Sequence, residues 1–108
     1  MAYDNSDVIG FIGRVDKEHT IMKVIRNNQV LSVGRHCTND ISPQDDKKIS
    51  RGHGSVEAQD RRVMWRVAKS KNGTFINGRL VDYPHMVMLW DGDTITIGDT
   101  PLTYMERR

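Results

Sequence analysis

Short stretches of β-forming residues, separated by turn residues, are the feature that most constrains the fold of this chain. No segment keeps apolar residues at helical spacing over three turns, so no long helix is expected. The turn residues Asn27-Asn28, Asn72-Gly73, Asn77-Gly78 and Asp91-Gly92 tolerate the positive φ of tight turns. Strands rich in Val, Ile, Thr and aromatic residues are expected at Val8–Val15, Thr20–Ile25, Gln29–Val33, Gly54–Ala58, Val63–Ala68, Thr74–Ile76, Met86–Leu89, Thr94–Ile97 and Leu102–Met105. The pattern predicts an all-β sandwich or barrel of about nine to eleven short strands.

The size of the chain leaves room for one folded domain. Its 108 residues predict a flexible N-terminal segment over residues 1–7 and a single domain over residues 8–108. The one cysteine, Cys37, excludes an internal disulfide. Because the chain has neither a signal-peptide pattern at its start nor an apolar run of about 18 residues, we expect an intracellular protein without a membrane span.

Positive charge is concentrated in one part of the chain. The net charge is only +2, but residues 35–79 hold ten of the 16 Lys and Arg residues and five of the 14 acidic residues. Two interpretations are open, a set of solvated loops or an anion-binding face. Residues 34–53 form the longest segment without strand character, and long loops in small domains are usually functional.

Four short motifs occur in order in and after this loop. They are Gly34-Arg35, Ser50-Arg51-Gly52-His53, Asn72-Gly73-Thr74 and Asn77-Gly78. Together with residues 39–41 and residues 89–98, they resemble the forkhead-associated (FHA) domain from about Leu31 to Tyr104. The resemblance implies a β-sandwich of two twisted sheets, in which loops at one end bind phosphothreonine in a partner protein.

The resemblance assigns the phosphate to Arg35 and Ser50, and the chemistry of these side chains agrees. An Arg offers a fork of donors to phosphate oxygens, and a Ser hydroxyl donates one short hydrogen bond. Arg51 is expected as a second phosphate contact. Lys71 stands where the family commonly has a small polar residue. It is expected either to add a phosphate contact or to alter the loop. The preference for phosphothreonine over phosphoserine is left open. Asn72 is expected to bind the peptide backbone through its amide, to form a tight turn, or both.

Other motif residues are expected to support the site rather than touch the ligand. Gly34 permits a tight turn or a close approach of the backbone that presents Arg35. The resemblance gives His53 a structural role in tying the binding loops together. Asn77 and Gly78 are expected to form a hairpin turn.

The sequence gives less support to catalysis, to nucleic-acid binding and to a role as a scaffold alone. Ser50 and His53 lack an orienting carboxylate, and the chain has no phosphate loop and no zinc or calcium spacing, so we expect neither catalysis nor a metal or other cofactor. A small basic β-barrel that binds nucleic acid is an alternative. Such a barrel needs exposed aromatic side chains on which bases can stack, but the only aromatic residues of the basic segment, Trp65 and Phe75, are expected in the core. A further alternative is an FHA scaffold that is used only for protein association.

The segment from Met86 to Trp90 raises the question of self-association. If Val87 faces the core, then Met86, Met88 and Trp90 point outward and form a possible homodimer interface. A local bulge or cover from residues 81–85 is the alternative. The layout also resembles the N-terminal module of DNA-damage mediator proteins, which implies a phosphorylated partner in the nucleus and no direct contact with nucleic acid.

Overall fold

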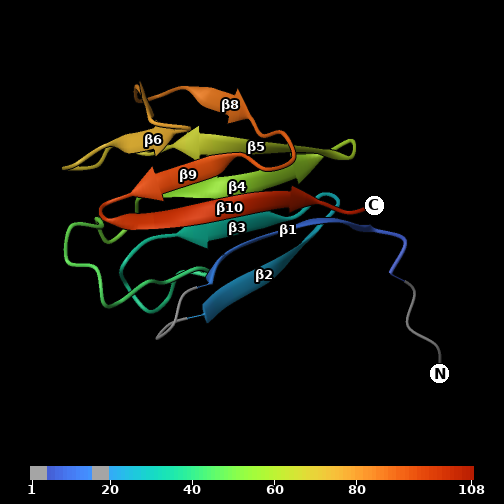
Figure 1. Ribbon diagram of the computed structural model, residues 1–108, viewed down its shortest axis with the longest axis horizontal. Coiled ribbons are helices and arrows are strands. Elements are labelled where there is room, and N and C mark those ends of the chain that lie inside the picture. Colours follow the sequence, from blue (N-terminus) through green and yellow to red (C-terminus); the bar gives the residue numbers. More distant parts are fainter. Residues whose placement is uncertain (1–4, 16–19) are drawn as a thin grey trace.

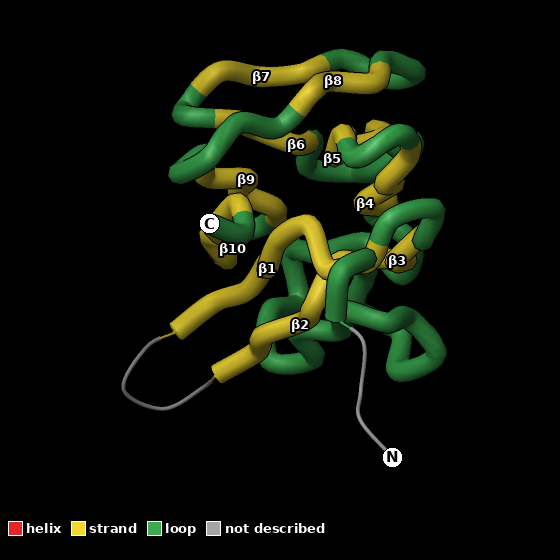
Figure 2. The backbone as a smooth tube through the Cα atoms, turned by 90° about the vertical axis from the view of Figure 1, so that its right-hand side faces the viewer, coloured by secondary structure: helices red, strands yellow, loops and turns green. Residues whose placement is uncertain are grey.

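Two antiparallel sheets form the fold. The computed structural model describes residues 5–15 and 20–108, and these residues contain no helix. Figure 1 shows the strands, and Figure 2 shows β9, β10 and β1 in one layer and β3, β4 and β5 in the other. The strands are β1 (Val8–Val15), β2 (Thr20–Arg26), β3 (Val30–Val33), β4 (Gly54–Gln59), β5 (Arg62–Val67), β6 (Thr74–Ile76), β7 (Arg79–Val81), β8 (Met86–Met88), β9 (Thr94–Ile97) and β10 (Thr100–Glu106).

The order of the strands differs from their order in the chain. The larger sheet has the order β2-β1-β10-β9-β6-β7, and the smaller has the order β3-β4-β5-β8. Strand β10 lies between β1 and β9, so the C-terminal strand closes the larger sheet against the N-terminal hairpin. The architecture confirms the predicted all-β sandwich and is not the closed barrel of the nucleic-acid alternative.

Most predicted strands are present within one or two residues of their expected bounds. Strand β7 was not predicted, because it has three residues and begins with the charged Arg79. The turn between β4 and β5 was not predicted either. It is made by Asp60 and Arg61, whose φ angles are 52° and 60°. Asp tolerates a positive φ, but such an angle is unusual for Arg.

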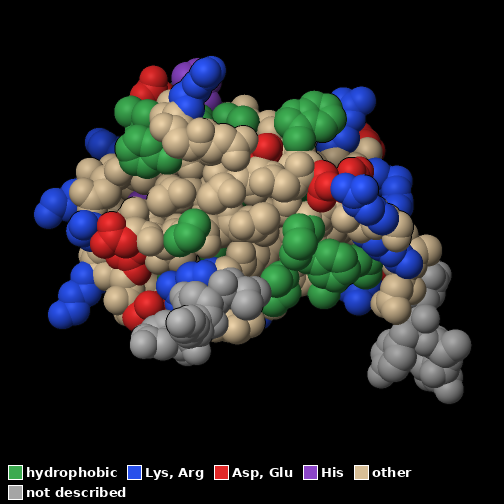
Figure 3. Space-filling model, viewed as in Figure 1, with side chains coloured by type: hydrophobic (Ala, Val, Ile, Leu, Met, Phe, Trp, Pro, Cys, Tyr) green, Lys and Arg blue, Asp and Glu red, His purple; other side chains and the backbone are tan. Residues whose placement is uncertain are grey.

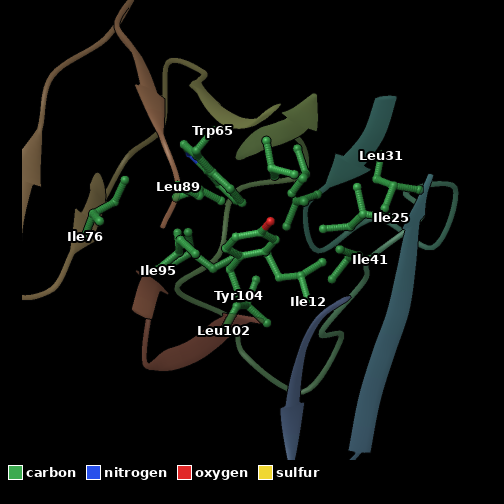
Figure 4. Close-up of a cluster of buried hydrophobic side chains, with 14 of the residues drawn as sticks. Ile12, Ile25, Leu31, Ile41, Trp65, Ile76, Leu89, Ile95, Leu102 and Tyr104 are labelled. Atoms are coloured by element: carbon green, nitrogen blue, oxygen red, sulfur yellow. The ribbon is translucent and has the colours of Figure 1, made fainter. Parts of the chain in front are cut away.

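The core lies between the two sheets. Trp65 of the smaller sheet is fully buried and lies near Leu89, Ile95 and Tyr104 (Figure 4). Burial of such side chains contributes about 1.5–3 kcal/mol each and holds the sheets together. The expectation that Phe75 lies in the core is wrong, because it points to the outer side of its sheet and is exposed.

Several long connections meet at one end of the sandwich. The loops over residues 34–53 and 68–73 leave the left end in Figure 1, opposite the chain's C-terminus. The turn over Gly98 and Asp99 between β9 and β10 lies at the same end. The basic segment of the sequence therefore supplies the loops at this end of the sandwich.

Within the described residues, no helix is long and apolar enough to cross a membrane.

Candidate functional site

Backbone hydrogen bonds bring the two arms of the 34–53 loop side by side. The N–H of Arg35 donates to the carbonyl oxygen of Ser50 at 3.0 Å, and the N–H of His36 donates to that of Arg51 at 3.4 Å. On the returning arm, the N–H of His53 donates to the carbonyl oxygen of Val33 at 2.8 Å. Arg35 and Ser50 are 15 positions apart in the sequence, and the loop places them next to each other.

A glycine allows the two arms to approach so closely. A Cβ atom on Gly34 would lie 2.1 Å from the carbonyl oxygen of Arg51, so no other residue fits without moving the backbone. Close approach, rather than positive φ, is therefore the reason for glycine here. The amide of Asn39 adds to the brace by donating to the carbonyl oxygens of Arg51 at 2.7 Å and His36 at 2.9 Å.

His53 connects this loop to the next one. Its ring is completely buried. Nδ1 accepts a hydrogen bond from the N–H of Ser50 at 3.1 Å, and Nε2 lies 2.7 Å from the carbonyl oxygen of Gly73. The carbonyl can only accept, so Nε2 carries the proton and the ring is neutral. Burial lowers the pKa of His53, outweighing the hydrogen bond to Gly73 and the charge of Asp46, which act in the opposite direction.

Lys71 and Asn72 meet the first loop directly. The N–H of Lys71 donates to Ser50 Oγ at 3.1 Å, and Asn72 Nδ2 donates to the carbonyl oxygen of Lys48 at 2.9 Å. Ser50 Oγ accepts from Lys71, and its own hydrogen has no acceptor among the described residues, so the hydroxyl is available to donate to an anion.

Three cationic side chains at this end of the sandwich are available for a ligand. Arg35 is partly exposed, and Arg51 and Lys71 are exposed. None of the three makes an ion pair with a described residue, whereas Lys48 pairs with Asp99 at 3.2 Å. A phosphate placed among them would meet positive charge from both loops without displacing a carboxylate from these three side chains.

A buried carboxylate anchors the far part of the loop, and sequence reasoning missed it. Asp46 accepts hydrogen bonds from the N–H of Asp99 at 2.7 Å, from Thr100 Oγ1 at 2.7 Å and from the N–H of Lys48 at 3.0 Å. Burial alone would raise the pKa of Asp46, but these hydrogen bonds outweigh it and keep the pKa below 3.8. An Asp in a charged loop gives no sequence signal that distinguishes it from a solvated one.

Asn77 and Gly78, which were expected to support the site, lie away from the two basic loops. Asn77 and Gly78 form a turn with φ angles of 51° and 81°, as expected for a hairpin. Asn77 Nδ2 donates to Asp93 Oδ1 at 2.9 Å, and its Oδ1 accepts from the N–H of Thr94 at 2.9 Å. The turn therefore braces the β8–β9 connection, and the structure does not bring it to the two loops.

The row from Met86 to Trp90 also lies outside the two basic loops. It belongs to β8, at the edge of the smaller sheet, and to the residues that follow it. Across the part of the chain that the structure describes, no three His, Cys, Asp or Glu side chains are arranged to hold a metal ion.

The FHA domain family model matches residues 31–98 of the chain. This range contains Arg35, Ser50, Arg51, Lys71 and Asn72. No curated protein matches the sequence.

Solved structures of low sequence identity share the fold. The FHA domain of the CT664 protein from Chlamydia trachomatis is 20% identical with a TM-score of 0.82, and the match covers 93% of this chain and 99% of that one. The N-terminal FHA domain of Saccharomyces cerevisiae Rad53p, in complex with a phosphothreonine peptide, is 19% identical with a TM-score of 0.77 and coverage of 93% and 94%. Mycobacterium tuberculosis EmbR, in complex with a low-affinity phosphopeptide, is 21% identical with a TM-score of 0.76, covering 91% of this chain and 24% of that one.

Proposed function

The chain belongs to the FHA domain family, and we propose on that premise that it binds phosphothreonine in a partner protein through its two basic loops. The observation that carries the proposal is the meeting of Arg35 and Ser50, 15 positions apart, with Lys71 and Asn72 of the second loop. Similar structures have been solved with phosphopeptides, among them the N-terminal FHA domain of Rad53p.

Each side chain has a part that its chemistry supports. Arg35 holds the phosphate through two of its guanidinium N–H groups, and the Ser50 hydroxyl donates to a third oxygen. Arg51 and Lys71 add positive charge. Asn72 binds the peptide backbone beside the phosphothreonine with the remaining hydrogen-bonding capacity of its amide, since only one amide N–H donates to Lys48.

We propose a binding module and not an enzyme, and the contacts of Ser50 and His53 support this choice. A nucleophilic Ser needs a base within reach of its Oγ. Here the backbone N–H of Ser50, not its Oγ, bonds to His53 Nδ1, and the other ring nitrogen bonds to Gly73. His53 therefore has no free nitrogen with which to accept a proton from Ser50. Gly34 and His53 support the site, because they hold the arms and the loops together.

An oriented phosphothreonine peptide library tests the proposal. The immobilised chain is expected to retain phosphorylated peptides and to release the same sequences without phosphate. Titration of the selected peptide against salt separates the proposal from the nucleic-acid alternative, because one phosphoresidue gives a shallow dependence and a run of phosphates a steep one. Equal retention of unphosphorylated sequences contradicts the proposal and favours a scaffold for protein association alone.

We also propose that the partner belongs to nuclear DNA-damage or checkpoint signalling, as the family resemblance implies. The fold occurs in a bacterium as well as in yeast, so the proposal concerns the partner and not the fold. The tagged chain is expected to accumulate at sites of DNA damage, and an Arg35→Ala variant is expected not to. Identical distribution of the two before and after damage contradicts this proposal.

A separate proposal concerns self-association of the chain through β8 and the residues that follow it. Val87 lies opposite the buried Trp65, and Leu89 is buried. Met86 and Trp90 are 38% and 66% exposed, and Met88 is half-buried beside Met64. We propose this row as a homodimer interface. Light scattering on the wild type and on Met88→Glu/Trp90→Glu tests it, and a dimer that persists in the folded double variant contradicts it.

A further inference from the structure

The two basic loops, residues 34–53 and 68–73, carry more positive charge than one phosphate requires. They contain three acidic and six basic residues, and the basic ones are Arg35, Lys47, Lys48, Arg51, Lys69 and Lys71. Among the described residues, only Lys48 of these six has a carboxylate partner, which is Asp99. Figure 3 shows Lys and Arg side chains that project from the left end of the molecule, where these loops lie. Five partly or fully exposed cations are therefore left without a carboxylate.

The three acidic residues of the loops are engaged elsewhere. Asp40 Oδ2 accepts hydrogen bonds from the N–H of Ser32 at 2.9 Å and from its Oγ at 3.2 Å. Asp45 pairs with Arg14 at 3.1 Å. Asp46 is buried and accepts hydrogen bonds from its own loop, from the turn before β10 and from β10 itself. The five cations are thus not balanced by acids of their own loops.

A single phosphothreonine does not balance this charge either. A phosphorylated side chain brings a charge of about −1.5 to −2 at neutral pH, which Arg35 and Arg51 alone are sufficient to neutralise. The positive charge of the three remaining Lys residues is left over. Because binding partners present complementary potentials, the bound segment is expected to carry negative charge in addition to its phosphate.

The loops favour an acidic peptide over a nucleic acid. Neither loop contains Phe, Tyr or Trp, the side chains on which proteins usually stack the bases of single strands. A hollow of about 380 Å³ beside Lys47 is also lined by Asp45 and Asp99, whose carboxylates would repel a long run of phosphates. The second loop contains no acidic residue. An acidic side chain of the partner is therefore expected to bind at the second loop.

Lys71 is the cation of the second loop that lies between the two parts of the site. Its N–H donates to Ser50 Oγ at 3.1 Å, and the next residue, Asn72, donates to the carbonyl oxygen of Lys48 at 2.9 Å. In the proposed function Ser50 binds the phosphate and Asn72 binds the peptide backbone beside it. The backbone of Lys71 is thus fixed between the phosphate and the neighbouring peptide residues, while its exposed ammonium stands on a flexible stem that can reach their side chains.

We propose that Lys71 binds a second acidic group, which the partner carries within a few residues of the phosphothreonine. The group is the carboxylate of Asp or Glu, or the phosphate of another phosphorylated residue, since a Lys ammonium binds either as a point charge. The chain thereby selects acidic or multiply phosphorylated segments over isolated phosphothreonines. The inference rests on the proposed function and extends it from the phosphothreonine to its neighbours.

A scan of phosphothreonine peptides tests the inference. The parent peptide has Ala at every flanking position, and each variant carries one Asp at one of these positions in turn. Fluorescence anisotropy is expected to show that Asp at one position raises the affinity about threefold to fivefold. Phosphoserine at the same position is expected to raise it further, because it carries more charge. A gain from Asp identifies a carboxylate as sufficient, and a gain from phosphoserine alone identifies a second phosphate, so either supports the inference.

Charge exchange assigns the contact to Lys71. Lys71→Glu is expected to prefer Lys over Asp at that peptide position, which reverses the preference of the wild type. Lys71→Thr keeps the backbone N–H but removes the charge, so it is expected to bind the Asp and Ala peptides equally. Lys69→Glu is the matched control, because Lys69 is exposed in the same loop whereas the hydrogen bond to Ser50 belongs to Lys71. It is expected to weaken all peptides and to keep the preference for Asp, and thermal melting shows that each variant is folded.

Different results contradict the proposed function and the inference. A wild-type chain that binds none of the phosphothreonine peptides contradicts both. Binding of the parent peptide without a gain from any flanking acidic residue overturns the inference alone. Loss of affinity by the same factor for all peptides in Lys71→Thr also overturns it, because Lys71 then contacts only the phosphate of the phosphothreonine. A single-stranded oligonucleotide that displaces the best acidic phosphopeptide at equal concentration assigns the additional charge to nucleic acid and overturns it as well.

Discussion

His53 Nε2 donates its hydrogen to the carbonyl oxygen of Gly73, 2.7 Å away. This bond joins the long loop after β3 to the loop before β6. Since Nδ1 of the same ring accepts from the N–H of Ser50, one neutral imidazole sets the position of Ser50 relative to the second loop.

Replacement of His53 by Phe is expected to destabilise the domain by about 2–4 kcal/mol. Phe fills the space, but it leaves the N–H of Ser50 and the carbonyl of Gly73 without partners, at about 1–3 kcal/mol for each buried group. Urea denaturation measures the change. His85→Phe is the control, because His85 is exposed, and a loss of stability equal to that of the control would show that the bridge contributes nothing.

Stability is expected to fall as the pH drops below about 6.5. Burial holds the pKa of His53 in the folded chain below its ordinary value of 6.5, so between the two values the unfolded chain binds the proton and the folded chain does not. The contribution of the neutral ring is therefore complete above pH 6.5 and is lost toward lower pH. Urea denaturation between pH 8 and pH 5 measures this, and His53→Phe is expected to lose less stability over the interval than the wild type. Parallel curves would contradict the assignment to His53.

Arg35→Ala is expected to weaken phosphopeptide binding by about a hundredfold or more with little effect on folding. Each charge-assisted hydrogen bond contributes roughly 1.5–3 kcal/mol, and a guanidinium fork makes two. Calorimetry with the selected peptide measures the affinity. Arg62→Ala on β5 is the matched control, exposed and distant from the loops, and a change of less than about threefold for Arg35→Ala would remove Arg35 from the site.

The bound form of the phosphate is expected to be the dianion. Binding is then strongest above the second phosphate pKa, which is about 6, and weakens as the pH falls through it. A glutamate in place of the phosphothreonine has less charge and fewer acceptor oxygens, so it is expected to bind much more weakly. Fluorescence anisotropy with both peptides measures this. His53→Phe shows which part of any pH effect comes from the protein, and equal affinity of the two peptides rejects the dianion requirement.

Two glycines of the same loop offer a matched pair. Gly34→Ala is expected to cost about 1–3 kcal/mol of stability, because its Cβ would overlap the carbonyl oxygen of Arg51. It is also expected to weaken phosphopeptide binding by separating the two arms. Gly52→Ala, with nothing within 4 Å of its Cβ, is expected to change little. Denaturation and calorimetry on both variants measure the difference, and similar behaviour of the two contradicts the close-packed arrangement of the arms.

Local patterns were sufficient to predict much of the fold. Alternating Val, Ile and Thr residues with Asn-Gly and Asp-Gly turns predicted the sandwich, because strand and turn preferences act over a few residues. The order of the short motifs was sufficient for the family. Strand β7 was missed because three residues beginning with Arg79 carry too little local preference. The Asp60-Arg61 turn was missed because Arg61 is not typical of positive φ.

By itself, then, the sequence determined the class of fold, the family and the residue types available to a phosphate. Only the tertiary structure decided which of these residues meet. The contact of Lys71 with Ser50, the buried carboxylate of Asp46 and the remote position of Asn77 all depend on distances between segments far apart in the chain. The tertiary structure also decided that Phe75 is exposed and that Phe11, Val24 and Met105 form one row. The physical reason is that the face on which a side chain lies follows from strand register and sheet order, which non-local pairing sets.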